Sequence, residues 1–227
     1  MNLQEPQNGD LPLRDRPSLI DVERVSVAVG GARLLAPISL QADAGQIVAL
    51  RGENGAGKTT LLRVLAGRTR ATTGTVRIGG SVVDERHPIF RRRVAVMIGL
   101  PPMAADLTVF DHVALVSSTW EQDAESVRVA TGRTLAEFGL TALGTRFPHE
   151  LSSGQTQLFG LALVFVRPFD VLLLDEPEQR LDADRVELVA QAMRNRCECG
   201  STIVLATHSA ILAEGTANRT LLLESAS

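Results

Sequence analysis

The residues best suited to chemistry in this sequence form one glycine-rich segment, Gly52–Thr60, which reads GENGAGKTT. The segment matches the pattern G-x-x-x-x-G-K-T in full. Its glycines allow backbone N–H groups to approach an anion closely. Lys58 supplies a full charge for the β- and γ-phosphates of a nucleotide, and Thr59 offers a hydroxyl to Mg²⁺. The predicted phosphate-binding residues are Gly52, Glu53, Asn54, Gly55, Ala56, Gly57, Lys58, Thr59 and Thr60.

Lys58 is the only lysine among the 227 residues, and the other basic residues are arginines. This usage suggests that arginine cannot substitute at this position, because a compact ammonium and a planar guanidinium fork are not interchangeable. A glycine-rich turn that merely joins two elements is the alternative. It is disfavoured because an apolar strand at 46–50 precedes the segment and a run with helical spacing at 61–66 follows it.

A second group of candidates is acidic. Residues 171–177 read VLLLDEP, an apolar strand that delivers Asp175 and Glu176 to its end. We predict that Asp175 holds Mg²⁺ through water, and that Glu176 orients an attacking water or accepts its proton. Two acidic residues that only cap a strand are the alternative, which the phosphate-binding segment in the same chain makes the weaker one.

Three shorter segments complete the set. The segment LSSGQ at 151–155 begins a predicted helix, where Ser152 is a good N-cap and the neighbouring N–H groups form an anion site. Leu181 and Asp182 follow Glu176 closely, and His208 follows a predicted strand. A lone histidine after a strand is usually structural, but in this order and spacing we interpret all three segments as functional.

The elements that must position these residues alternate between strand and helix patterns. The sequence predicts a meander of short antiparallel strands at 18–42, a hairpin at 74–83, strands at 94–98, 171–174, 201–206 and 219–224, and helices within 108–144 and at 152–166 and 182–197. The unbroken apolar run at 171–174 is typical of a central strand that is buried on both faces. The fold class is therefore α/β, a mixed core with a helical insertion.

Composition narrows the class of protein. The chain is 44% hydrophobic and 22% charged, so it can bury a core. Its net charge of −3 gives no sign of the basic surface that proteins use to bind nucleic acid. Its one basic run, Arg91–Arg93, is interpreted as a solvated turn or strand entry. Cys197 and Cys199 lack a second pair with metal-site spacing. No stretch resembles a signal peptide or reaches the roughly 20 apolar residues that cross a bilayer, so membrane work would need a partner.

Together the ordered segments GENGAGKTT, LSSGQ, LLLDEP, LD and THS resemble the ATP-binding cassette (ABC) ATPases, over almost the whole of 18–224. This resemblance implies ATP and Mg²⁺ as cofactors and a head-to-tail pair of cassettes. It implies catalytic roles for Glu176, His208 and Lys58, magnesium ligation by Thr59 and Asp175, and a D-loop at the dimer seam formed by Leu181 and Asp182. The signature motif acting on the partner's ATP would comprise Leu151, Ser152, Ser153, Gly154 and Gln155.

The resemblance also implies a domain plan: a P-loop NTPase core with a mixed sheet, an N-terminal antiparallel β subdomain and an inserted α-helical subdomain. Residues 1–17 are expected to be a flexible tail and 18–227 a single domain. Within it the core would span 18–99 and 166–227, with the helical insertion at about 100–165.

Several positions depart from the family pattern. Gly99 stands where a glutamine is usual, Val29 where an aromatic residue stacks on adenine, and Ser153 where a second glycine is favoured. The helix after the signature lacks the usual arginines, and residues 178–180 form an unusual run, Glu-Gln-Arg. Because the catalytic set is intact, we predict a working ATPase that is slow or tightly coupled.

The leading hypothesis is the ATPase subunit of an ABC transporter, attached peripherally to the cytoplasmic face of the membrane through a separate membrane-spanning permease. Its second cassette would be an identical or a different chain. A small stand-alone cassette favours export. The alternatives are a soluble ABC ATPase that acts on nucleic acid or ribosomes, a phosphate-loop kinase or GTPase, and a regulatory cassette that binds ATP with little turnover.

Overall fold

The computed structural model describes residues 18–121 and 123–224, so the predicted tail at 1–17 lies outside the described residues. The strands are β1 (Ile20–Val29), β2 (Ala32–Ala42), β3 (Ile47–Arg51), β4 (Thr73–Ile78), β5 (Ser81–Val82), β6 (Val94–Ile98), β7 (Val171–Asp175), β8 (Thr202–Ala206) and β9 (Arg219–Leu222). The α-helices are α1 (Lys58–Leu65), α2 (Pro88–Arg93), α3 (Val109–Ser118), α4 (Ala124–Glu137), α5 (Ser153–Phe165), α6 (Ala183–Glu198) and α7 (Ala210–Gly215). Two 3₁₀ turns span Thr141–Leu143 and Pro148–Glu150.

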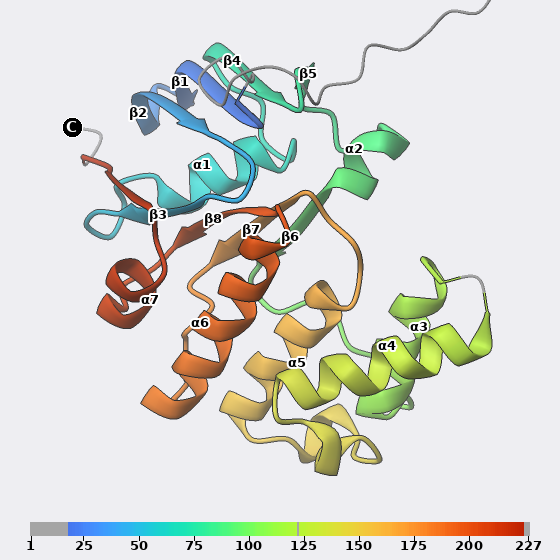
Figure 1. Cartoon of the computed structure of the whole chain (residues 1–227). Helices are drawn as coiled ribbons and strands as arrows, with labels where there is room; N and C mark the ends of the chain where they lie inside the picture. The colour runs from blue at the N-terminus through green and yellow to red at the C-terminus, as the bar shows by residue number, and fades with distance from the viewer. Residues whose placement is uncertain (1–17, 122, 225–227) are drawn as a thin grey trace, which may run out of the picture.

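A parallel sheet with the strand order β6-β7-β8-β3-β9 forms the centre of the fold (Figure 1). Strand β7 is buried up to its last residue, Asp175, as the unbroken apolar run at 171–174 predicts for a strand covered on both faces. Leu50 of β3, Ala206 of β8 and Asp175 of β7 lie in register across three neighbouring strands. The segments that follow these residues therefore meet at one edge of the sheet.

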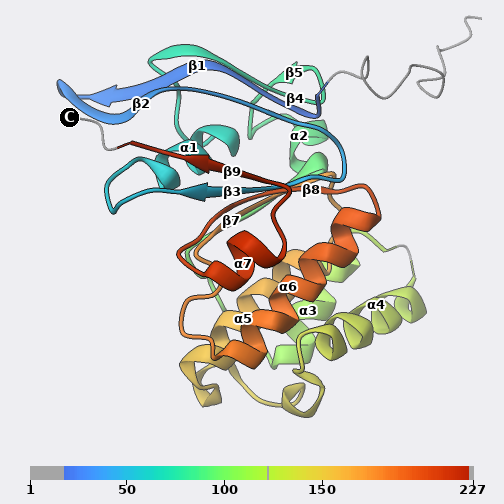
Figure 2. The same cartoon turned by 60° about the vertical axis from the view of Figure 1, so that its left-hand side comes forward.

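Alternate residues of β3 face two different layers. Val48 and Leu50 pack in the core that contains α1 and the antiparallel sheet, whereas Ile47 and Ala49 pack in the core that contains α5 and α6. The views in Figures 1 and 2 agree that α1 lies on one side of the parallel sheet and α5 and α6 on the other. Helices α3 and α4 pack beyond α5 and complete the second layer.

The antiparallel sheet has the order β2-β1-β4-β5. The prediction of several short strands at 18–42 was wrong in detail, because two long strands fill this region. The apolar runs at 19–22 and 25–29 belong to one strand, β1, which bulges between them at Arg24. Arg24 has φ +47°, and its N–H donates to Ser39 Oγ at 3.0 Å. Gly74 allows β4 to approach this bulge, since a Cβ there would lie 2.2 Å from the carbonyl oxygen of Glu23.

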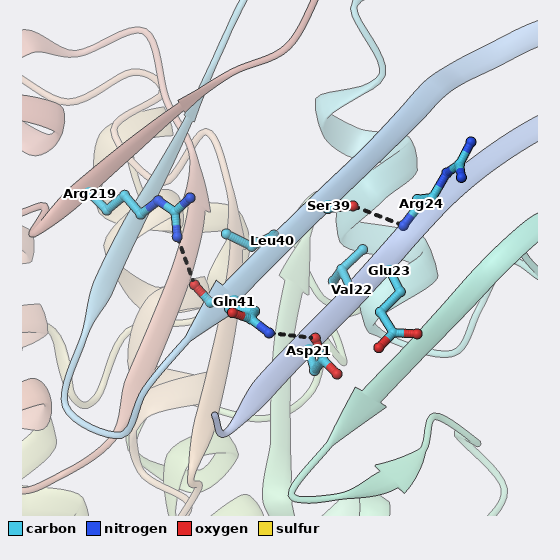
Figure 3. A pocket seen from close by; sticks show the side chains of 8 residues that line it. All are labelled: Asp21, Val22, Glu23, Arg24, Ser39, Leu40, Gln41 and Arg219. Carbon is cyan, nitrogen blue, oxygen red and sulfur yellow. Dashed lines mark hydrogen bonds between the residues drawn. The ribbon is translucent and has the colours of Figure 1, made fainter. Parts of the chain in front are cut away.

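A hollow of about 430 Å³ lies where the edge strands of the two sheets meet (Figure 3). Its polar groups bind one another. Arg219 Nη1 of β9 donates to the carbonyl oxygen of Gln41 of β2 at 3.2 Å, and Gln41 Nε2 donates to Asp21 Oδ1 at 3.4 Å. The first of these hydrogen bonds joins the edge of the parallel sheet to the edge of the antiparallel one, and the second lies within the antiparallel sheet.

Three local predictions need correction. Arg91–Arg93, interpreted as a solvated turn or strand entry, do lead directly into β6, but they form the last turn of helix α2. Arg93 Nε pairs with Asp170 Oδ2 at 2.9 Å. Helix α7 was not predicted because its six residues are too few to show a helical period. The last strand ends at Leu222 instead of residue 224.

Across the described ranges, no helix is both long enough and apolar enough to cross a membrane.

Candidate active site

The glycine-rich segment forms a loop between β3 and α1. Two of its glycines are required by close packing as well as by backbone angle. Gly52 has φ +148°, and a Cβ there would lie 2.4 Å from the carbonyl oxygen of Leu223. Gly57 has φ +92°, and a Cβ there would lie 2.7 Å from the carbonyl oxygen of Leu34. The loop is therefore held tightly against β2 and the chain beyond β9.

Lys58 is the first residue of α1 and is only 7% exposed. Its Nζ donates to the carbonyl oxygens of Gly52 at 2.8 Å and Glu53 at 3.0 Å, so the ammonium lies over the loop. Helix α1 begins with no side-chain cap and no acidic residue in its first turn. The positive end of the helix and the ammonium thus converge on the loop, the arrangement that binds phosphate.

Thr59 and Asp175 come together beside this loop. Thr59 Oγ1 donates to Asp175 Oδ2 at 2.8 Å. In the described ranges no cluster of three or more His, Cys, Asp or Glu residues could hold a metal by itself. A hydroxyl and one carboxylate next to a phosphate loop nevertheless fit Mg²⁺, which usually takes one or two protein carboxylates together with substrate phosphates and waters.

Glu176 follows β7 directly and has φ +48°, a left-handed conformation that is strained for a residue with a side chain. Its carboxylate is 40% exposed. His208 Nε2 lies 3.6 Å from Glu176 Oε1, and Gln179 Nε2 donates to Glu176 Oε2 at 3.4 Å. The structure therefore brings the carboxylate and the histidine together from β7 and β8.

A hollow of about 710 Å³ connects the phosphate loop with His208. Its lining residues are Arg51, Gly52, Glu53, Asn54, Thr207, His208, Thr220 and Leu222. The space is thus bordered by residues 52–54 of the phosphate loop and by His208 of the predicted catalytic set.

Two residues of this region were not predicted. Gln157 of α5 is 3% exposed, and its Nε2 donates to the carbonyl oxygens of Glu176 at 3.4 Å and Pro177 at 3.1 Å. Glu178 binds the segment that carries His208 through three hydrogen bonds. The only signal for Glu178 was its place in the unusual Glu-Gln-Arg run, and Gln157 gave none.

The LSSGQ segment forms the beginning of α5. Ser152 caps the helix, with its Oγ accepting from Gln155 N–H at 3.3 Å, and Gln155 Oε1 accepts from Ser152 N–H at 2.8 Å. Gly154 packs against the chain before α6, since a Cβ there would lie 2.8 Å from the carbonyl oxygen of Arg180. Asp182 caps α6 by accepting from Arg185 N–H at 2.9 Å. The structure groups LSSGQ with the predicted D-loop.

Two of the positions that depart from the family pattern, Gly99 and Val29, are open to solvent. Gly99 has φ +73°, and no atom lies within 4 Å of a Cβ placed there. Val29 is 62% exposed at the end of β1. Neither position supplies a polar or aromatic side chain to the site.

Comparison with known proteins decides the family. Residues 35–179 match the family described as ABC transporter. The chain belongs to this family. It is 31% identical over 216 residues to the cytochrome c biogenesis ATP-binding export protein CcmA of Xanthomonas oryzae pv. oryzae, covering 95% of this chain and 98% of that protein.

Further relatives of this ABC cassette include the thiamine import ATP-binding protein ThiQ of Chelativorans sp., which is 34% identical over 211 residues (91% of this chain, 84% of that protein). A solved ATP-binding subunit of an ABC transporter superposes with a TM-score of 0.81 at 25% identity, covering 92% of this chain and 89% of that one. The fold is that of an ABC ATPase, with a phosphate-loop core and an antiparallel β sheet. As a member of the family, the chain is an ATPase that uses ATP and Mg²⁺.

Proposed function

We propose that this cassette is the cytoplasmic ATPase subunit of an ABC transporter, and that it powers transport through a separate membrane-spanning permease. The observation that carries this proposal is the match to transporter ATP-binding subunits along nearly the whole length of both chains. None of the described helices can span a bilayer. Docking to a permease would place the chain at the inner face of the membrane. The helical insertion proposed at about 100–165 would supply the contact.

The site supports a mechanism based on positioning and charge. Lys58 and the loop N–H groups would hold the β- and γ-phosphates, while Thr59 and Asp175 would hold Mg²⁺. When bound, magnesium would neutralise part of the charge on the phosphates. Glu176 would orient the attacking water or accept its proton, and His208, 3.6 Å away, would face the γ-phosphate.

We further propose that the working unit is a pair of cassettes. Helices α1 and α5 pack in different cores on opposite faces of the parallel sheet. Lys58 begins α1 and the LSSGQ segment begins α5, so the phosphate loop and the signature motif of one chain belong to different layers. This arrangement favours a dimer in which the phosphate loop of one chain meets the signature motif of the other. Leu181, which lies beside Gly154 of LSSGQ, and the neighbouring Asp182 would then lie at the seam.

Export is the direction we favour, since the Xanthomonas relative that spans the same length is an export protein. Import is the second candidate, because the thiamine relative is named for import and is 34% identical.

Affinity purification from detergent-solubilised membranes of the source cell tests the transporter role. We expect a polytopic membrane protein to accompany the cassette in stoichiometric amount. A cassette recovered only from the soluble fraction, or with ribosomal or DNA-bound proteins, would contradict the proposal and favour the soluble ABC ATPase.

A further inference from the structure

We propose that Glu178 is a positioning residue that holds His208 beside Glu176. The inference rests on the function proposed above, in which His208 and Glu176 take part in ATP hydrolysis. It assigns a role to a carboxylate that lies outside the nucleotide-binding motifs.

Three donors from the segment after β8 converge on a single oxygen of Glu178. Oε1 accepts from Thr207 Oγ1 at 2.6 Å, from His208 N–H at 2.8 Å and from Ser209 N–H at 3.2 Å. The first of these lies within the range of charge-assisted O–H···O⁻ bonds, which are about twice as strong as neutral ones. One carboxylate therefore fixes three consecutive residues, with His208 in the middle.

Packing alone does not fix the imidazole of His208, because its side chain is 52% exposed. Its neighbours are more firmly held. Thr207 is 1% exposed, and Ser209 caps α7 by accepting from Leu212 N–H at 3.3 Å. Glu178 thus acts at the one exposed residue between a buried strand end and a helix start, and it binds that residue through its backbone.

Glu178 is itself anchored in the turn that carries Glu176. Its carbonyl oxygen accepts from Leu181 N–H at 3.0 Å, and the preceding Pro177 carbonyl accepts from buried Gln157. Glu176 N–H also donates to the carbonyl oxygen of Ala206 at 2.9 Å, which extends the pairing of β7 with β8. The turn and the His208 segment are therefore joined by a backbone hydrogen bond and by the hydrogen bonds of the Glu178 carboxylate.

The second carboxylate oxygen of Glu178 has a different environment. Oε2 is buried and finds no hydrogen-bond partner among the residues that the structure describes. The interactions of the side chain are thus concentrated on Oε1, which glutamine can reproduce with its amide oxygen. Glutamine is therefore the conservative substitution and alanine the disruptive one.

The test compares Glu178→Ala, Glu178→Gln and a matched control, Glu198→Ala, which removes an exposed glutamate at the end of α6. We expect Glu178→Ala to lower kcat about 10- to 100-fold, since misplacement of a reacting group by about 1 Å can cost about 10²-fold. KM for ATP should stay close to that of the wild type, because the phosphate loop is untouched. Glu178→Gln should recover most of the turnover, and Glu198→Ala should retain all of it.

Hydrogen exchange gives a readout independent of turnover. The amides of His208 and Ser209 should exchange faster in Glu178→Ala and at nearly the wild-type rate in Glu178→Gln. If Glu178→Ala does not fold, Thr207→Val, which removes one of the three donors with little change in volume, should show a smaller loss of kcat and faster exchange of the His208 amide. The Ser209 amide cannot serve in this variant, because Thr207 Oγ1 also accepts from Ser209 N–H at 3.0 Å. The proposal would be overturned if Glu178→Ala, or Thr207→Val where the first does not fold, kept the wild-type kcat and the wild-type rate of amide exchange.

A double-mutant cycle with His208→Ala separates this inference from the function on which it rests. Adding Glu178→Ala to His208→Ala should cause no further loss of kcat if the carboxylate acts through the histidine. Losses that multiply would overturn the positioning role alone. Full turnover in the single variant His208→Ala would contradict the proposed function of the histidine, and the role of Glu178 would fall with it.

Discussion

Thr59 and Asp175 are separated by 116 residues in the sequence, and Thr59 Oγ1 donates to Asp175 Oδ2 at 2.8 Å. Thr59 belongs to α1 after β3, and Asp175 ends β7. Strand β8 lies between these two strands in the parallel sheet. The pair therefore joins the phosphate loop to the carboxyl end of a strand that is not its direct neighbour.

Removal of the Thr59 hydroxyl should weaken magnesium binding at the site. We expect Thr59→Val to raise the Mg²⁺ concentration for half-maximal ATPase activity about 10- to 100-fold, the range found when partners of a metal site are removed. A magnesium titration of ATPase activity measures the shift, with Thr59→Ser and the distant Thr69→Val as controls. An unchanged titration in Thr59→Val would show that this hydroxyl does not face the metal.

Arginine should not replace Lys58. The ammonium of Lys58 is nearly buried and donates to two loop carbonyls, which a larger planar guanidinium cannot reproduce in the same space. We expect Lys58→Arg to weaken ATP binding at least about tenfold, equivalent to about 1.4 kcal/mol. Equilibrium binding of a fluorescent ATP analogue measures this, and Arg63→Lys on the exposed face of α1 is the control. Wild-type ATP affinity in Lys58→Arg would contradict the inference that this position requires lysine.

Glu176 should govern turnover without governing binding. Glu176→Gln keeps the shape of the side chain and removes its basicity, so kcat should fall about 10²–10⁴-fold if the carboxylate acts as a general base. ATP affinity should change little, because the phosphates are held by the loop. Single-turnover hydrolysis and ATP binding separate the two effects, and wild-type hydrolysis in this variant would remove Glu176 from the mechanism.

Gly74 should be essential to the antiparallel sheet. Its φ is +80°, and a Cβ there would lie 2.2 Å from the carbonyl oxygen of Glu23. Gly74→Ala should lower the free energy of unfolding by about 2–5 kcal/mol, combining about 1–2 for the left-handed backbone with about 1–3 for the steric overlap. Gly80→Ala isolates the first contribution, because Gly80 has φ +76° with no atom within 4 Å of its Cβ position. Equal losses in urea unfolding of the two variants would contradict the overlap.

The two cysteines should differ in reactivity. Burial raises the pKa of the Cys197 thiol, with a smaller contribution from the charge of Glu198, and Cys197 Sγ donates to the carbonyl oxygen of Gly45 at 2.6 Å. A raised pKa means less thiolate at any given pH, so alkylation of Cys197 should be slow below that pKa and accelerate as the pH rises through it. Exposed Cys199 should react first with iodoacetamide at pH 8, as followed by mass spectrometry. Equal rates in the native protein, with Cys199→Ser as the reference, would contradict this.

The sequence predicted the elements whose signals are local and repeated. The strands 94–98 and 171–174 and the helix after Ser152 all appear, because unbroken apolar runs and helical periods extend over several residues. Helix α2 escaped because its six residues carry no periodic apolar face, and the bulge at Arg24 was mistaken for a break between strands. Short elements and bulges depend on tertiary contacts more than on their own residues.

By itself, the sequence determined the phosphate loop, the acidic end of β7 and the membership of an ABC family. The first two depend on residues a few positions apart, and the third depends on the order in which several short motifs follow one another. Only the tertiary structure decided that Thr59 meets Asp175, that His208 lies 3.6 Å from Glu176 and that Glu178 binds the segment between them. These contacts depend on the order of strands in the parallel sheet and on the turn after β7. No local pattern of residues specifies that order, since it follows from the packing of segments far apart in the chain.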